Sequence, residues 1–236
     1  MIKKIFQFFN LSYRKRQTAS NHFLLSYLKT LGIIPSDLKW YEKAFTHRSL
    51  NSEHSNERLE FLGDAILNKL LSEHLFLKFP QLKEGELTKM RALLASRKYL
   101  NNKAKQLNIS KFIQANLQAS EQQHHVAGNA LEALLGAVYL DLGEEAVKKF
   151  IFSFIYNKEM TAENIMSLDN DYKSKIYHWA QEKKREIFFR HAKINGNTFR
   201  AELVLENRYV FIGEGKSKKE AEQEAAKKVW IDLQKK

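Results

Sequence analysis

One short stretch near residue 60 constrains the fold more than any other, because it places three carboxylates three and four residues apart. At ~100° per helical residue, Glu57, Glu60 and Asp64 fall within an arc of roughly 60°. The apolar residues Leu59, Leu62 and Ile66 point to the opposite side, where a core can bury them. Like charges at helical spacing repel, so this pattern favours a cation-binding face over an ordinary solvated surface.

The chain up to about residue 160 is predicted to be all-helical. Apolar residues recur at three- and four-residue spacing, and Pro35, Pro80 and Gly143 punctuate the pattern. The recurring stretches are residues 23–31, 59–77, 87–100 and 130–142. We therefore predict a helical domain over residues 21–160, preceded by a basic N-terminal arm over residues 1–20.

A second domain is predicted over residues 171–236, after a linker at 161–170. A short helix over Tyr172–Glu182 precedes stretches in which apolar residues alternate with polar ones, as expected for strands. These stretches are 187–194, 199–205 and 209–213. Asn195-Gly196 is a tight-hairpin signal, 206–208 make a second turn, and a capping box from Ser217 to Glu220 begins a final helix. The predicted order is helix, three antiparallel strands, helix.

Charge and composition narrow the possible partners. The net charge is +12, and the surplus of Lys and Arg lies in residues 1–36 and 171–236, outside the segment with the acidic helix. Two basic flanks suit a polyanion such as RNA. The chain has no cysteine, which excludes disulfides and thiolate zinc sites and fits a reducing, cytoplasmic compartment. No apolar run reaches ~18 residues, so no membrane span is expected.

Four segments together resemble the ribonuclease III family, which cleaves double-stranded RNA. The twelve residues that start at Asn56 are similar to its first signature, and a second signature is similar to Asn129–Asp141. Residues 44–49 and 84–88, with Arg91, match further family segments. The Gly-Glu-Gly-Lys-Ser-Lys-Lys-Glu-Ala sequence that starts at Gly213 resembles a double-stranded-RNA-binding domain. The implied fold is an all-helical nuclease domain followed by an α-β-β-β-α domain.

The resemblance implies a catalytic centre that uses divalent metal. Glu60, Asp64, Asn129 and Glu132 correspond to the metal ligands of the family, although the family has Asp where this chain has Asn129. Oxygen ligands suit Mg²⁺, for which Mn²⁺ can substitute. Glu57 and Glu84 match further acidic positions, so the expected catalytic set is Asp64, Glu132, Glu57, Glu60 and Glu84. The implied products carry 5′-phosphate and 3′-hydroxyl ends at a staggered cut in duplex RNA.

The second domain carries the predicted RNA contacts. A helix N-terminus attracts phosphate, and the lysines at the start of the final helix add full positive charges. The predicted RNA-binding residues are Lys216, Ser217, Lys218, Lys219, Lys173, Ser174 and Tyr177. Two features depart from the family. Tyr177 and His178 stand where it has Gln or Glu, and the turn at 194–197 is shorter than usual. We expect shape-directed binding that depends more on contacts between lysine and phosphate.

Two hypotheses for function remain open. The first is an active endoribonuclease that processes ribosomal and other structured RNA. The second is a double-stranded-RNA-binding protein whose nuclease domain only dimerises, because Asn129 replaces the family Asp. The resemblance also implies a homodimer through Phe61, although a buried contact within the chain is an alternative for that side chain. The sequence indicates no membrane and no identifiable protein partner.

Overall fold

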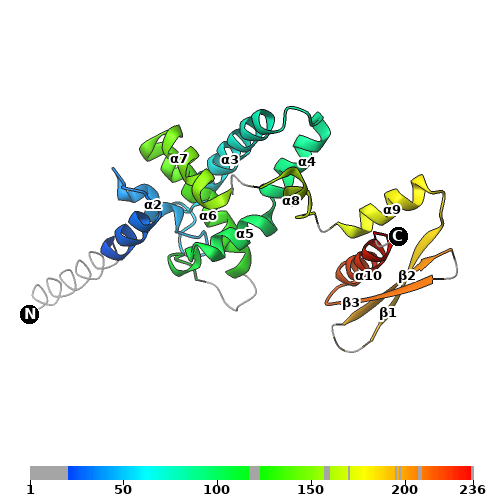
Figure 1. Cartoon of the computed structure of the whole chain (residues 1–236). Coiled ribbons are helices and arrows are strands. Elements are labelled where there is room, and N and C mark those ends of the chain that lie inside the picture. The colour runs from blue at the N-terminus through cyan, green and yellow to red at the C-terminus, as the bar shows by residue number, and fades with distance from the viewer. Residues whose placement is uncertain are drawn as a thin grey trace, which may run out of the picture. The chain divides into compact units, whose positions relative to one another are not determined.

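The computed structural model contains two compact units, Met1–Met166 and Ser167–Lys236 (Figure 1). It describes residues 21–116, 123–156, 160–169, 171–194, 196, 198–206 and 209–234, without the side chains of 123–125 and 209. The predicted basic arm at 1–20 therefore lies outside the described residues. So do Asn195 and residues 207–208 of the two predicted turns.

The first unit is built from helices, as its spacing of apolar residues predicts. Its helices are residues 21–30, α2 (Leu38–Ala44), α3 (Glu57–Lys78), α4 (Glu84–Leu94), α5 (Arg97–Gln106), α6 (Gln123–Leu142), α7 (Glu144–Phe150) and α8 (Ala162–Met166). A 3-10 turn at Ile109–Lys111 and a π-helical turn at Ile151–Ile155 complete it. Within the described residues of this unit, extended pairing is limited to an isolated bridge between Thr46 and Gln114.

Two details differ from expectation. The predicted helix over 87–100 is two helices, because α4 ends at Leu94 and Ser96 caps α5 by accepting a hydrogen bond from the Tyr99 amide at 3.3 Å. The predicted linker at 161–170 contains α8, whose Ile165 is fully buried. A single buried side chain gives too little periodicity to distinguish a packed helical turn from a linker.

The core of the first unit forms where α3 crosses α6. Two glycines let the helices approach closely. A Cβ added to Gly63 would lie 1.8 Å from the carbonyl oxygen of Glu132, and one added to Gly136 would lie 2.4 Å from that of Leu59. The buried face of α6 consists of small and branched apolar residues, among them Ala133 and Val138. The crossing therefore places the acidic face of α3 beside the face of α6 that carries Glu132.

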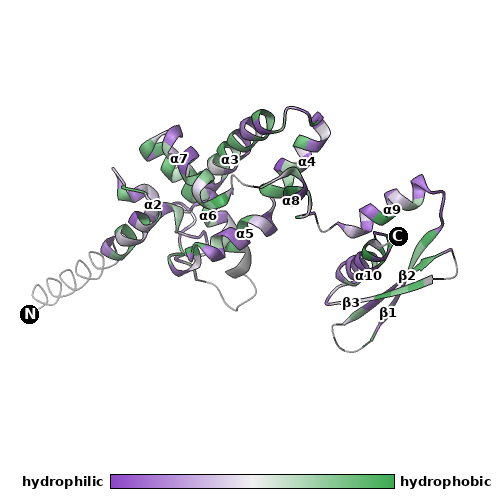
Figure 2. Ribbon diagram, viewed as in Figure 1, coloured by the Kyte–Doolittle hydropathy of each residue, from purple (hydrophilic) through white to green (hydrophobic). Residues whose placement is uncertain are grey.

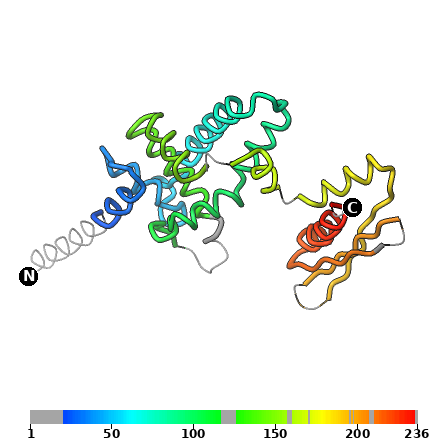
Figure 3. Tube along the Cα trace, in the orientation of Figure 1, coloured from blue at the N-terminus to red at the C-terminus, as the bar shows by residue number. Residues whose placement is uncertain are grey.

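The second unit is a three-stranded sheet packed against two helices. Its elements are α9 (Tyr172–Glu182), β1 (Ile187–Lys193), β2 (Phe199–Leu205), β3 (Tyr209–Gly215) and α10 (Lys218–Leu233). The strands are antiparallel in the order β1-β2-β3, and the chain can be followed through them as a meander in Figure 3. Both units thus confirm the predicted fold class.

The middle strand shows which face of the sheet is buried, because Ala201 and Leu203, two residues apart on β2, are both fully buried. Leu203 packs with Ile176 of α9 and with Ala225, Ala226 and Val229 of α10. Figure 2 shows hydrophobic and hydrophilic stretches on the helices and strands of both units. The buried face fixes how the strands pair, because a slip of one residue would turn every apolar side chain outward.

The start of α10 differs in one detail from the predicted capping box. The Ser217 hydroxyl accepts from the Glu220 amide at 3.2 Å, as predicted. The returning bond to the Glu220 carboxylate comes from the amide of Lys216 at 2.8 Å instead of that of Ser217. The first turn of α10 is therefore tied to Lys216, the residue that follows β3.

Candidate active site

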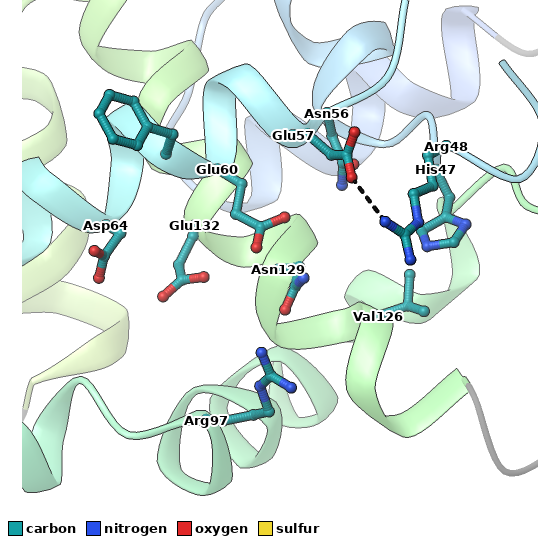
Figure 4. A pocket seen from close by; sticks show the side chains of 11 residues that line it. His47, Arg48, Asn56, Glu57, Glu60, Asp64, Arg97, Val126, Asn129 and Glu132 are labelled. Carbon is teal, nitrogen blue, oxygen red and sulfur yellow. Dashed lines mark hydrogen bonds and ion pairs between the residues drawn. The ribbon is translucent and has the colours of Figure 1, made fainter. Parts of the chain in front are cut away.

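A cavity of about 680 Å³ opens between α3, α5 and α6. Six of its lining residues were singled out from the sequence, namely Glu57, Glu60, Phe61, Asp64, Asn129 and Glu132. Five others line it as well, namely His47, Arg48, Asn56, Arg97 and Val126. Figure 4 shows the carboxylates of α3 and α6 facing this space from one side and Arg97 from the other.

The carboxylates share enough negative charge to perturb one another. The pKa of Glu132 is raised to about 7, chiefly by burial and also by the charges of Asp64 and Glu60, while the charge of Arg97 acts to lower it. Burial also raises the pKa of Glu60, although a hydrogen bond from Asn129 acts in the opposite direction. The Asn68 amide nitrogen donates to Asp64 Oδ1 at 2.8 Å and orients that carboxylate. The cavity between these carboxylates therefore favours a positively charged ligand.

Two arginines contribute the positive charge of the cavity, and they differ in their hydrogen-bond and ion-pair partners. Arg48 Nη1 lies 3.2 Å from Glu57 Oε1, so Glu57 pairs with a residue nine positions away and not with the adjacent Arg58. Arg97 makes no hydrogen bond or ion pair with another residue in the described part of the chain. Burial and the charge of Arg48 lower the pKa of His47, so this ring is neutral at pH 7.

The donor set fits a hard divalent cation. Among the described residues, no three His, Asp or Glu side chains already converge closely enough to hold a metal. Like charges repel, and the charges of Asp64 and Glu60 add to the effect of burial on the pKa of Glu132. A cation placed among these oxygens would relieve it, and carboxylate and amide oxygens are the ligands that Mg²⁺ and Mn²⁺ take in proteins.

Glu84 lies apart from these residues. It is the first residue of α4, is exposed, and accepts a hydrogen bond from the Thr88 hydroxyl at 2.9 Å. It does not line the cavity.

A second expectation changes at Leu62, which is only partly buried and lines a groove next to the cavity instead of the core.

Phe61 is 80% exposed, which excludes the alternative of a buried contact within the described part of the chain. It borders a largely apolar groove of about 630 Å³ between α2, α3 and α6. Trp40, Leu62 and Leu140 also line this groove. An aromatic ring beside an open apolar groove is a typical arrangement at a protein–protein interface.

The lysines predicted at the start of α10 are exposed, in agreement with a phosphate-binding surface. Lys216, Lys218 and Lys219 follow one another around the N-terminal turn that Ser217 caps. Exposed amide groups at a helix N-terminus and three ammonium groups concentrate positive potential at one point.

The three predicted residues on α9 lie in different environments. Lys173 Nζ is 2.7 Å from Glu222 Oε2 and lies over the Phe189 ring, so its ammonium is held within the unit. The Ser174 hydroxyl donates to Asp171 Oδ2 at 2.7 Å and helps to cap α9. Tyr177 is exposed and available to a ligand. Local spacing indicated none of these differences.

Arg97 is the charged residue of the cavity that no sequence pattern singled out. It is a single arginine in a chain rich in basic residues, and no local pattern distinguishes it from its neighbours. Arg48 belonged to a family segment but carried no predicted role. Their place in the cavity depends on which helices pack together.

Comparisons with known proteins match each of the two units to a protein family. Residues 37–159 match the family described as Ribonuclease-III-like, and residues 172–233 match the double-stranded RNA binding motif. The chain is 36% identical to Ribonuclease 3 of Zunongwangia profunda, over 94% of this chain and 95% of that protein. It is 37% identical to Ribonuclease 3 of Carboxydothermus hydrogenoformans, over 87% and 93%.

The nuclease domain of ribonuclease III from Campylobacter jejuni is similar in structure, with a TM-score of 0.51 and 34% identity. That match covers 57% of this chain and 95% of the solved domain. Within the part of the chain described here, no helix is both long enough and apolar enough to cross a membrane.

Proposed function

Because the chain belongs to the ribonuclease III family, we propose that it cuts double-stranded RNA at the α3–α6 cavity with the help of a divalent cation. The observation that carries this proposal is the convergence of Glu60 and Asp64 with Asn129 and Glu132 on one cavity. The products would be 5′-phosphate and 3′-hydroxyl ends. The substrates would be ribosomal precursors and other structured RNA in the cytoplasm.

Glu60, Asp64, Asn129 and Glu132 would hold Mg²⁺, or Mn²⁺ in its place. When bound, the cation supplies Lewis-acid activation of water and stabilises the leaving oxygen. The side chains themselves perform other tasks. Asn68 orients Asp64, Asn129 donates to Glu60, and Glu57 holds Arg48 at the rim, where its guanidinium can meet the RNA backbone. Glu84 would act on RNA outside the cavity.

The second unit would hold the duplex while the first unit cuts it. The α10 N-terminus with Lys216, Lys218 and Lys219 would bind phosphates across a groove, and Tyr177 would contact the sugar edge. This division of labour predicts that binding and cleavage can be separated by mutation.

We also propose that two copies associate through Phe61 and the groove beside it. The nuclease domain of ribonuclease III from Campylobacter jejuni is described as having structural flexibility in a region involved in dimer formation. In this chain the exposed Phe61 ring and the groove lined by Trp40 and Leu140 form a self-complementary pair of features. Phe61→Asp should convert the dimer to a monomer in sedimentation experiments, whereas Phe76→Asp, at another exposed phenylalanine of α3, should not.

Incubation of the purified protein with a long RNA duplex and Mg²⁺ tests the proposal. Fragments with 5′-phosphate ends are expected, and none should form from single-stranded RNA of the same sequence. Tight duplex binding without cleavage at any Mg²⁺ or Mn²⁺ concentration would instead favour the binding-protein hypothesis for Asn129.

A further inference from the structure

Arg97 occupies a fixed position opposite the carboxylates. It is the first residue of α5, and the Ser96 cap sets where that helix begins. The Asn101 Oδ1 atom accepts a hydrogen bond at 2.8 Å from the amide of Gly128, the residue before Asn129. A Cβ on Gly128 would lie 2.7 Å from the same oxygen, so α5 and α6 are in close contact here. The start of α5 therefore cannot move independently of Asn129.

The guanidinium of Arg97 makes no hydrogen bond or ion pair with a described residue, although its charge acts on Glu132 and Glu60. Arg48, the other arginine of the cavity, is held by Glu57. Arg97 points towards Asn129 and Glu132 in Figure 4. Neither of these residues, nor any other residue that the structure describes, accepts a hydrogen bond from it. A guanidinium carries five N–H donors in a planar fork, which matches two oxygens of a phosphate. A fork with free donors, carried on the anchored first turn of α5, is suited to an incoming anion.

The charge of the cavity explains why such a group is needed. Four carboxylates line it, against two guanidiniums and a neutral His47. A phosphodiester that approaches carboxylates is repelled unless positive charge lies close to its path. The neutral amide of Asn129 faces Arg97, so the guanidinium is not drawn into an ion pair at that position.

We propose that Arg97 is a catalytic residue that binds the non-bridging oxygens of the phosphate to be cleaved. The inference rests on the proposed function, because it assigns a contact within that reaction. Arg97 acts on the phosphate and not on the cation, which it repels. Its removal should therefore weaken the reaction and strengthen metal binding, and these opposite signs distinguish it from a residue that only organises the ligands.

The test uses full-length Arg97→Ala and Arg97→Lys, with Lys98→Ala as the matched control. Lys98 is the next residue of α5, is exposed, and does not line the cavity. Single-turnover cleavage is measured with enzyme and Mn²⁺ both saturating. Arg97→Ala should cleave ~100-fold more slowly while its duplex affinity stays within about twofold. Arg97→Lys should recover only part of the rate, because an ammonium lacks the fork. Lys98→Ala should behave as the parent.

Calorimetric titration with Mn²⁺ in the absence of RNA gives a second readout. Arg97→Ala should bind Mn²⁺ about threefold to tenfold more tightly than the parent, since one positive charge has left the cavity. A parental cleavage rate for Arg97→Ala, weaker or unchanged Mn²⁺ binding, or a rate recovered fully at saturating Mn²⁺ would each overturn the inference. A parent protein that does not cut duplex RNA would overturn the proposed function, and the Mn²⁺ titration would still decide whether Arg97 faces the cation site.

Discussion

Gly63 of α3 lies directly against the backbone of Glu132 on α6, so close that a Cβ on the glycine would sit 1.8 Å from the Glu132 carbonyl oxygen. The contact joins the two halves of the candidate active site. Asp64, next to Gly63, and Glu132 itself both face the cavity, and any change in the helix crossing alters the separation of their carboxylates.

Gly63→Ala should therefore destabilise the protein and reduce cleavage together. Overpacking at a helix crossing costs about 1–3 kcal/mol, and backbone at both sides cannot move away as a flexible side chain could. Gly85→Ala is the control, because Gly85 lies in α4 with open space around it. That variant should change stability by less than about 1 kcal/mol. Urea denaturation measures both, and equal stability of the two variants would contradict the close crossing.

Glu132→Gln should abolish cleavage and leave duplex binding intact. The amide keeps the size of the side chain but removes a charge from the proposed metal site, whereas the lysines proposed to hold RNA lie in the other unit. Loss of at least ~100-fold in rate is expected, as for removal of groups that tune a metal centre. A filter-binding assay checks the affinity, and wild-type rates in this variant would disprove the site assignment.

Asn129→Asp should shift the Mg²⁺ activation curve to lower concentration. The substitution adds a formal charge for the cation but removes the amide that donates to Glu60. Because another anion then raises the pKa of its neighbours, the gain should be largest above pH 8 and smaller near pH 6. Activity measured against Mg²⁺ at both pH values tests this expectation. A shift to higher Mg²⁺ at pH 8 would count against Asn129 as a ligand.

Metal binding should weaken as the pH falls through about 7, the raised pKa of Glu132. The cation needs the ionised carboxylate, so protons and metal compete for it. The stability of the metal-free fold depends on pH in the opposite direction. In metal-free protein, Glu132 stabilises the fold below its ordinary pKa of 4.5, and this contribution is lost as the pH rises through about 7. Thermal unfolding at pH 4, 6 and 8 measures this loss. The parent should lose stability between pH 4 and pH 8, and Glu132→Gln, which has no carboxyl group to ionise there, should lose less.

Lys218→Ala combined with Lys219→Ala should weaken duplex binding and flatten its salt dependence. Each lost phosphate contact removes one counterion-release contribution, whereas stability should change little because both side chains are exposed. Lys173→Met provides the contrast. Its ammonium is paired with Glu222, so this variant should lose stability without a comparable change in the salt slope. An unchanged salt slope in the double variant would show that α10 does not hold the duplex.

The sequence by itself determined the fold class and the location of most elements. Apolar spacing predicted the helices of the first unit and the change to strands in the second, and the bounds of α9 and β2 agree with those predicted. It also placed the three carboxylates of α3 on one face of a helix. These features are local, because a helix or strand repeats its buried face within a few residues.

Only the tertiary structure decided which side chains meet. The crossing at Gly63 joins the carboxylates of α3 and α6 in one cavity, and the packing of α5 on α6 adds Arg97 to it. The loop before α3 brings Arg48 to Glu57, and Glu84 is left outside. In the second unit, packing of α9 against α10 commits Lys173 to Glu222. Such contacts arise from the angle and separation at which whole elements pack, and residues distant in the chain carry no periodic signal of that geometry.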